Sequence, residues 1–259
     1  MNIGVIPARL GSTRFPEKIL APLQGRPLVL HAYERACRAA SLDEVLIAVD
    51  DEQVRQVLEK FGARVVMTSR RHQSGTDRVA EAVAEREVEV VVNIQGDEPL
   101  LEPSLIDDLV DCFQDPATVI ATAAARNLTV AELLNPNVVK VFLDESLLAV
   151  DFRRLVPDHL IGGCYRHVGI YAFRQETLLR FTQLPPSFNE IEQRLEQLRA
   201  LDNGIPIRAV LTTYAAYGVD TKADLELVAS IMENSIEPEI NQPAVEPVSE
   251  VENGGGSTD

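Results

Sequence analysis

Basic residues and cysteines are scarce in this chain, and each shortage narrows what the protein can be. The sequence has 24 Lys and Arg against 40 Asp and Glu, a formal net charge of -16. Nucleic-acid partners are therefore not expected, because the phosphate backbone requires a broad basic surface. Cys37, Cys112 and Cys164 are scattered and lack metal-ligand spacing, so we expect buried thiols in a reducing cytosol.

Long apolar runs are also missing. No stretch approaches the roughly 18 to 20 continuous apolar residues that span a bilayer. The first residues, Met1 to Gly4, lack the basic and apolar regions of a secretory signal. We therefore expect a cytoplasmic protein without membrane insertion. With 259 residues, of which 46% are hydrophobic, the chain can form one large or two small domains with a core.

The acidic charge is concentrated towards the C-terminus. Residues 235–259 carry six acidic residues and no basic one, and they are rich in Pro, Glu and Gly. This composition is typical of segments that cannot bury enough apolar surface to fold. We predict one domain over residues 1–233, with a modest excursion around 144–180, followed by an acidic disordered tail over 234–259.

The first half of the chain alternates short apolar runs with amphipathic segments. Near-continuous Val and Ile runs between helices indicate an α/β fold with a mostly parallel sheet and helices on both faces. The helix that starts at residue 52 should be capped by Asp50 and Asp51 and ended by Gly62. Strands are expected at 3–8, 44–50, 63–68 and 88–97, and helices at 27–40, 52–61, 76–86 and 103–113.

The second half is less regular. Its strands are expected to run antiparallel in part and to add to the same sheet. We place strands at 137–144, 146–150, 166–173 and 207–213, and helices at 188–201 and 221–232.

Two common phosphate-binding motifs are missing as well. The chain has no G-x-x-x-x-G-K-[ST] loop, and G-x-G-x-x-G does not follow the first strand. Instead "IPARLGSTRFPEK" (6–18) places Arg9, Arg14 and Lys18 among loop-forming residues. Guanidinium groups grip phosphate oxygens with paired hydrogen bonds, and lysine adds a point charge. The segment is either a phosphate-binding loop at the end of a strand or a set of cations that only balances neighbouring acids.

Two aspartates follow other apolar runs. Asp97 lies in "NIQGDEPLL" after the most hydrophobic strand, and Asp220 lies in "YGVDTKADL" before the last helix. Mg²⁺ is usually held by one or two carboxylates together with substrate phosphates. The alternative is that these acids cap the helices that start nearby. Combined with the basic loop, the carboxylates suggest a metal-assisted nucleotidyl transfer.

A larger, ordered set of segments resembles one family. The set comprises "IPARLGSTRFPEK", "HQSGTDR", "VVNIQGDEP", "NPNVVKV", "RHVGIYAF", "LEQLRAL" and "GVDT". It resembles the 3-deoxy-manno-octulosonate cytidylyltransferases, or CMP-Kdo synthetases, over residues 1 to about 233. The resemblance implies a Rossmann-like, nucleotide-sugar-transferase-like fold and a cytoplasmic homodimer of lipopolysaccharide biosynthesis. Such an enzyme joins CTP to the acidic eight-carbon sugar Kdo with Mg²⁺, giving CMP-Kdo and pyrophosphate.

The resemblance also implies site residues at the matched positions. Those expected to act on the triphosphate or hold Mg²⁺ are Arg9, Lys18, Asp97 and Asp220, the last two as metal ligands. Ser12 and Arg14 are also expected along the triphosphate. Those expected to hold cytosine and ribose are Pro7, Ala8, Gln73, Ser74, Gly75 and Thr76, with Arg78 nearby. Those expected to bind the sugar are Gln95, Arg153, His167 and Glu190.

The chain departs from the family pattern at several positions. Glu17 stands where the family usually has glycine, Gln193 replaces an acid, and "AVDFRRLVP" (149–157) differs on the sugar side. Asp151 either faces the acceptor, which would favour a sugar bearing an ammonium group such as 8-amino-Kdo, or pairs with Arg154 and points outward. We favour the outward position and Kdo. The alternatives are a different 2-keto acid sugar or a non-catalytic nucleotide-binding relative.

Overall fold

The computed structural model of the protein describes residues 1–11 and 15–234. The site candidates Ser12 and Arg14, and the acidic tail apart from its first residue, lie outside the described residues. The boundary at residue 233 and the disorder of the tail therefore stay predictions.

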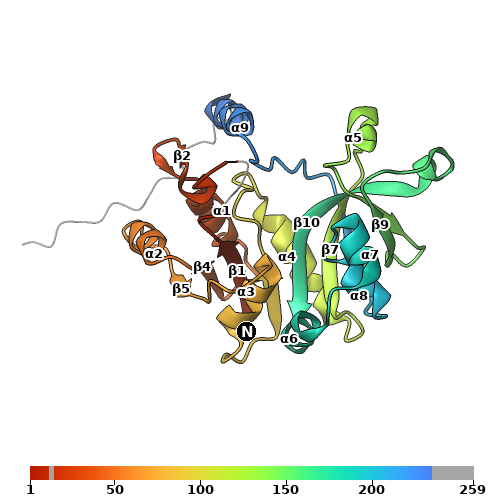
Figure 1. The fold of residues 1–259 in the computed structure, drawn as a ribbon, viewed down its shortest axis with the longest axis horizontal. Coiled ribbons are helices and arrows are strands. Elements are labelled where there is room, and N and C mark those ends of the chain that lie inside the picture. The colour runs from red at the N-terminus through yellow and green to blue at the C-terminus, as the bar shows by residue number, and fades with distance from the viewer. Residues whose placement is uncertain (12–14, 235–259) are drawn as a thin grey trace, which may run out of the picture.

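One nine-stranded sheet organises the described chain (Figure 1). Its main path runs β11-β7-β10-β6-β1-β4-β5, and β8 and β9 extend it as a hairpin on β10. Along that path β10 is antiparallel to both its neighbours, and the other strands share one direction, as predicted. The strands are β1 (Asn2–Ala8), β4 (Glu44–Val49), β5 (Val65–Met67), β6 (Val90–Asn93), β7 (Ile120–Ala125), β8 (Lys140–Leu143), β9 (Ala149–Arg153), β10 (Cys164–Arg174) and β11 (Arg208–Thr212).

Helices cover both faces of the sheet, because alternate residues of its central strands enter two separate cores. In β6, Val90 and Val92 belong to one buried cluster and Val91 to the other. The first cluster receives side chains from α1, α2 and α4, and the second from α3, α6 and α8. The longer helices are α1 (Leu28–Ala36), α2 (Glu52–Glu59), α3 (Gly75–Val83), α4 (Pro103–Asp111), α6 (Gln175–Gln183) and α9 (Lys222–Asn234).

Local signals set several element ends as expected. The side chain of Asp51 accepts a hydrogen bond from the Gln53 amide and caps α2, and Gly62 follows that helix with φ 80°. Asp50, the other expected cap, instead pairs with Arg78. Ser74 and Asp77 form a reciprocal capping box at the start of α3, which satisfies two backbone amides at once.

Other elements differ from the prediction. The helix expected over 188–201 is broken at Arg194, whose φ of 53° ends α7 (Phe188–Gln193) before α8 (Leu198–Asp202). The strand expected at 146–150 starts later, because Asp144 accepts hydrogen bonds from two following amides and forms a turn first. Strand β7 and helices α5 (Val130–Leu134) and α6 were not predicted.

Two expectations from composition have different outcomes. None of the described helices is long and apolar enough to cross a membrane. The expectation of buried thiols is wrong: Cys37 is exposed, Cys112 and Cys164 are only partly buried, and none of the three forms a disulfide.

Lys140 is fully buried and joins two loops in the second half of the chain. Its Nζ donates hydrogen bonds of 2.8 Å to the carbonyls of Asn135 and Arg154. The segment after α5 is thereby fixed against the end of β9. This contact gives the lysine of "NPNVVKV" a structural role.

We expect Lys140→Met to lower the free energy of unfolding by about 1–3 kcal/mol, because two carbonyls lose their donor. Urea denaturation measures the change. Lys60→Met, on the exposed end of α2, is the matched control and should stay within about 0.5 kcal/mol of the parent. Equal stability of Lys140→Met and the parent would contradict this role.

Candidate active site

A pocket of about 370 Å³ opens where β1 and β6 end. Both strands are parallel and adjacent, so the loops that follow them meet at one edge of the sheet. Most of the residues expected at the nucleotide line it. The lining consists of Pro7, Arg9, Gly11, Lys18, Ile19, His72, Gln73, Ser74, Gly75, Arg78, Gln95, Gly96, Asp97 and Asp220.

Lys18 joins the two aspartates inside this pocket. Its Nζ lies 2.6 Å from Asp97 Oδ2 and 3.1 Å from Asp220 Oδ1, and its side chain is 13% exposed. Burial acts to lower the pKa of Lys18, but the attraction of the two carboxylates outweighs it and raises the pKa above its ordinary value. The ammonium therefore stays charged and marks a point where a cation is favoured.

Helix capping does not account for either aspartate. At the start of α9, Thr221 Oγ1 accepts from the Asp224 amide, and Asp224 Oδ2 accepts from the Thr221 amide and hydroxyl. Thr221, not Asp220, is thus the capping residue. Helix α4 starts after Glu102 without a side-chain cap, so Asp97 does not cap it. The capping alternative is wrong for both residues.

Gly75 lets the start of α3 approach the end of β1. A Cβ at this position would lie 3.2 Å from Pro7 Cγ, so a side chain here would require the Pro7 ring to shift by a few tenths of an ångström. Ala8, expected at the nucleotide, is 1% exposed and packs in the core. Its side chain therefore does not line the pocket.

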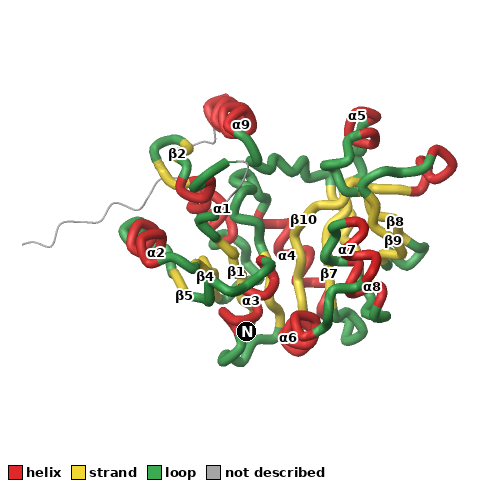
Figure 2. The backbone as a smooth tube through the Cα atoms, viewed as in Figure 1, coloured by secondary structure: helices red, strands yellow, loops and turns green. Residues whose placement is uncertain are grey.

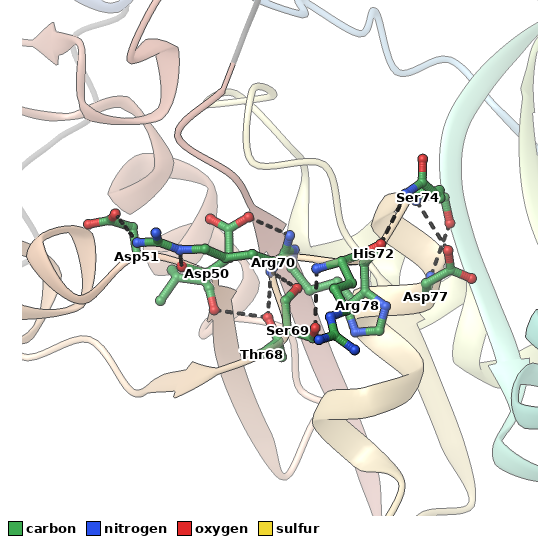
Figure 3. A network of polar contacts seen from close by, with 12 residues as sticks. Asp50, Asp51, Thr68, Ser69, Arg70, His72, Ser74, Asp77 and Arg78 are labelled. Carbon is green, nitrogen blue, oxygen red and sulfur yellow. Dashed lines mark hydrogen bonds and ion pairs between the residues drawn. The ribbon is translucent and has the colours of Figure 1, made fainter.

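Arg78 lines the pocket and also supports its wall. It is 3% exposed and donates hydrogen bonds to Asp50 Oδ2 at 2.7 Å and Thr68 Oγ1 at 2.5 Å. Figure 3 shows these contacts beside Arg70, which pairs with Asp51. The guanidinium of Arg78 is thus engaged with the ends of two strands, which makes it a support of the loop before α3.

The residues that were expected to bind the sugar do not lie together in the structure. Gln95 lines the pocket. Arg153 lies in a separate groove of about 1090 Å³ between β9 and α7. Glu190, in the first turn of α7, accepts hydrogen bonds of 2.8 and 2.5 Å from Arg199. The structure therefore does not bring Arg153 and Glu190 to Gln95.

Asp151 does not make the expected pair with Arg154. It accepts a 2.5 Å hydrogen bond from Arg153 Nε, two residues along the same strand. Arg154 instead donates to the backbone carbonyls of Pro136, Gln193 and Arg194. Strand alternation places Asp151 and Arg153 on one face of β9, so the Asp151 carboxylate pairs with Arg153.

His167 lies on β10 and is partly buried. Its Nε2 is 3.0 Å from Thr122 Oγ1, and burial lowers its pKa to about 3. The ring is therefore neutral near pH 7. It also lies 5.5 Å from the Tyr171 ring, measured between centroids.

A polar cluster next to the pocket contains Thr76, which was expected at the nucleotide but does not line the pocket, and Glu196, which was not singled out from the sequence. Thr76 donates a 2.5 Å hydrogen bond to Glu196 Oε2, and both residues line a cavity of about 30 Å³ together with Tyr171. Asn93 Oδ1 and Glu196 Oε1 are buried without a hydrogen-bond partner among the described residues. Buried atoms of this kind call for a ligand or water. The motif "LEQLRAL" contains Glu196, but nothing in its spacing distinguished that acid.

Glu98, directly after Asp97, has a different environment from its neighbour. Burial, and after it the charge of Asp97, raises the pKa of Glu98 to about 7. Its Oε2 accepts a 3.0 Å hydrogen bond from the hydroxyl of Tyr214.

Comparison with known proteins agrees with this geometry. Residues 3–208 match the family model described as Cytidylyltransferase. A relative from Geobacter sulfurreducens is 44% identical over 245 residues, covering 88% of this chain and 98% of its own length. One from Nitratidesulfovibrio vulgaris is 46% identical over 240 residues, covering 88% and 95%. Both are named 3-deoxy-manno-octulosonate cytidylyltransferase.

The chain belongs to the 3-deoxy-manno-octulosonate cytidylyltransferase family. A solved structure titled CMP:2-keto-3-deoxy-manno-octonic acid synthetase complexed with CTP aligns with a TM-score of 0.85 and 39% identity, over 90% of this chain and 98% of that one. A cytidylyltransferase from Leptospira borgpetersenii, 17% identical with a TM-score of 0.64, shares the fold. The resemblance and the fold class inferred from the sequence are both confirmed.

Glu17, the departure from the family's glycine, takes the backbone conformation that glycine favours. Its φ is 54° and its ψ 26°, in the left-handed region that costs an ordinary residue about 1–2 kcal/mol. The side chain is exposed and lines a groove with Phe15, Pro16 and Lys222 rather than the candidate active site. The added charge thus faces away from the pocket.

We expect Glu17→Gly to raise the free energy of unfolding by about 0.5–1 kcal/mol, because relief of the strain exceeds the added flexibility of the unfolded chain. Glu17→Gln keeps the strain, removes the charge and should leave stability unchanged. Since the carboxylate faces solvent, both variants should keep the KM for CTP within about twofold of the parent. A large fall of that KM in Glu17→Gln would show that the charge reaches the nucleotide.

Proposed function

We propose that the protein transfers the cytidylyl group of CTP to Kdo, releasing pyrophosphate, as a cytoplasmic enzyme of lipopolysaccharide biosynthesis. The observation that carries the proposal is the pocket in which Lys18 lies between Asp97 and Asp220, beside Arg9. It occurs in a chain 39% identical to a synthetase solved with CTP. The family resemblance over nearly the whole described chain supports the same reaction.

The pocket suits an in-line displacement at phosphorus. The anomeric hydroxyl of Kdo attacks the α-phosphorus of CTP, the bond from that phosphorus to the bridging oxygen breaks, and pyrophosphate leaves. Negative charge grows on the leaving oxygens, so cations aimed at them stabilise the transition state more than the ground state. Arg9 and Lys18 are the described cations in the pocket that we assign to this role.

Mg²⁺ fits the donor set of the pocket. Asp97 and Asp220 offer hard carboxylate oxygens, and one ammonium nitrogen lies within 3.1 Å of both. Within the described ranges no group of three His, Cys, Asp or Glu side chains could hold a metal, and Mg²⁺ commonly takes one or two carboxylates plus substrate phosphates. When bound, the ion would supply charge neutralisation of the triphosphate.

The described contacts favour a binding site for the acceptor sugar, Kdo, near Gln95. The buried cluster of Thr76, Glu196 and Tyr171 adjoins the pocket through Gly75, and His167 lies against the Tyr171 ring. We therefore assign Gln95, His167 and Glu196 to the Kdo side. Glu190 is committed to Arg199, and Arg153 to Asp151.

Kdo is favoured over an ammonium-bearing sugar because Asp151 has a cationic partner of its own and lines a different groove. Because its charge is balanced by Arg153, the Asp151 carboxylate offers little attraction to an acceptor bound near Gln95. The non-catalytic alternative is disfavoured because the residues expected to act on the triphosphate or hold Mg²⁺ all line the pocket. These residues are Arg9, Lys18, Asp97 and Asp220.

A homodimer is supported by apolar side chains exposed beside the groove of β9 and α7. Their exposed fractions are 58% for Val150, 65% for Leu155, 77% for Phe188 and 62% for Ile191. Apolar residues grouped in this way are typical of protein interfaces. We propose that a second copy of the chain covers this face.

The function is tested by pyrophosphate release from CTP and Kdo as a function of Mg²⁺. We expect Arg9→Ala and Asp220→Asn each to lower kcat/KM by about 100-fold or more, because each removes charge stabilisation or a metal ligand. Arg64→Ala, an exposed arginine paired with Glu44, is the control and should retain parental turnover. Parental rates in both pocket variants would refute the assignment.

The acceptor is tested by kcat/KM for Kdo and for 8-amino-Kdo. We expect the parent to prefer Kdo, and Asp151→Asn to change the ratio of the two by less than about fivefold, since an exposed ion pair contributes at most about 1 kcal/mol. A parental preference for the amino sugar that disappears in Asp151→Asn would instead identify the amino sugar as substrate.

A further inference from the structure

Asp220 reaches the pocket on a segment without helix or strand. Residues 213–221 connect β11 to α9 and cross from the β7 side of the molecule to the α1 side (Figures 1 and 2). No regular ladder of hydrogen bonds fixes such a segment. The position of the Asp220 carboxylate therefore depends on individual contacts.

Three described hydrogen bonds join residues 213–219 to elements other than β11, and Asp220 itself bonds Lys18 and the start of α9. The hydroxyl of Tyr214 donates to Glu98 Oε2 at 3.0 Å, Arg166 donates to the carbonyl of Ala216 at 2.7 Å, and the Val219 amide donates to the carbonyl of Asp97 at 2.9 Å. Two of the three end on residues 97 and 98. The segment that carries Asp220 is thus tied to the same loop that carries Asp97.

Like the fully buried Val219, Tyr214 packs in the core, and among residues 213–219 it is the one whose side chain makes one of these three bonds. It is 3% exposed and belongs to the cluster that includes residues of β6 and α4. Its ring fixes the start of the segment, and its hydroxyl sets the distance to the Asp97 loop. Loss of the hydroxyl alone would leave the ring packed and the other two contacts in place.

We propose that Tyr214 is a positioning residue of the reaction, because its hydrogen bond to Glu98 sets Asp220 opposite Asp97 and thereby forms the two-carboxylate cation site. The inference rests on the proposed function only in taking these aspartates as the metal ligands. Small displacements of such groups have large effects, since metal ligands act only in a narrow geometry.

The test measures the Kd of Mn²⁺ alone, by electron paramagnetic resonance, on the purified full chain without nucleotide. We expect Tyr214→Phe to raise this Kd about three- to tenfold, the size of one lost hydrogen bond. Asp220→Asn should raise it further. Tyr33→Phe is the matched control: its hydroxyl accepts a 3.1 Å hydrogen bond from the Arg64 amide, and it does not line the pocket.

A merely structural role is separated by two other readouts. The Tm of Tyr214→Phe should stay well above the assay temperature, although buried Glu98 loses its donor, and its Kd for CTP without metal should match the parent. An unchanged Mn²⁺ Kd in Tyr214→Phe, an equal rise in Tyr33→Phe, or no rise in Asp220→Asn would overturn the proposal. Because none of these measurements uses Kdo or turnover, failure of the proposed reaction would be recognised separately.

Discussion

The contact of one ammonium group with two carboxylates holds the site of this protein together. Lys18 meets Asp97 and Asp220, so three segments from the start, the middle and the end of the domain converge on one nitrogen. Two carboxylates this close repel each other unless a cation lies between them. The lysine supplies that cation within the chain, and a divalent ion with a triphosphate supplies the same compensation in the proposed reaction.

The sheet makes this convergence possible. Because β1 and β6 are parallel neighbours, the basic loop and the Asp97 loop leave the sheet at the same edge without any special arrangement. The approach of α3 is then fixed by Gly75 against Pro7, and the loop before it by the buried Arg78. Polar side chains such as that of Arg78 thus stabilise the walls of the pocket rather than serving mainly to bind the substrate.

Sequence reasoning succeeded where a local signal or a periodic pattern decides the structure. The cap at Asp51 and the near-continuous apolar runs of the central strands, which pack into a core on each face of the sheet, are of this kind. It failed where distant contacts decide. Strand β7 is alanine-rich and has weak β-propensity, and it is a strand because β10 and β11 lie on both sides of it. The break at Arg194 and the partner of Asp151 likewise follow from packing that spacing does not encode.

The reversed strand β10 has a consequence for motion. It pairs with β6 through residues 171–174 and with β7 through residues 166–168 and 171–173, with one irregularity between them, so backbone hydrogen bonds on both edges of β10 link the two parts of the sheet. Hinge closure between lobes requires a connection of a few loop residues, and these hydrogen bonds leave no such hinge. Any closing of the protein around its substrates must therefore come from the loops at the edge, while the sheet beneath them remains rigid.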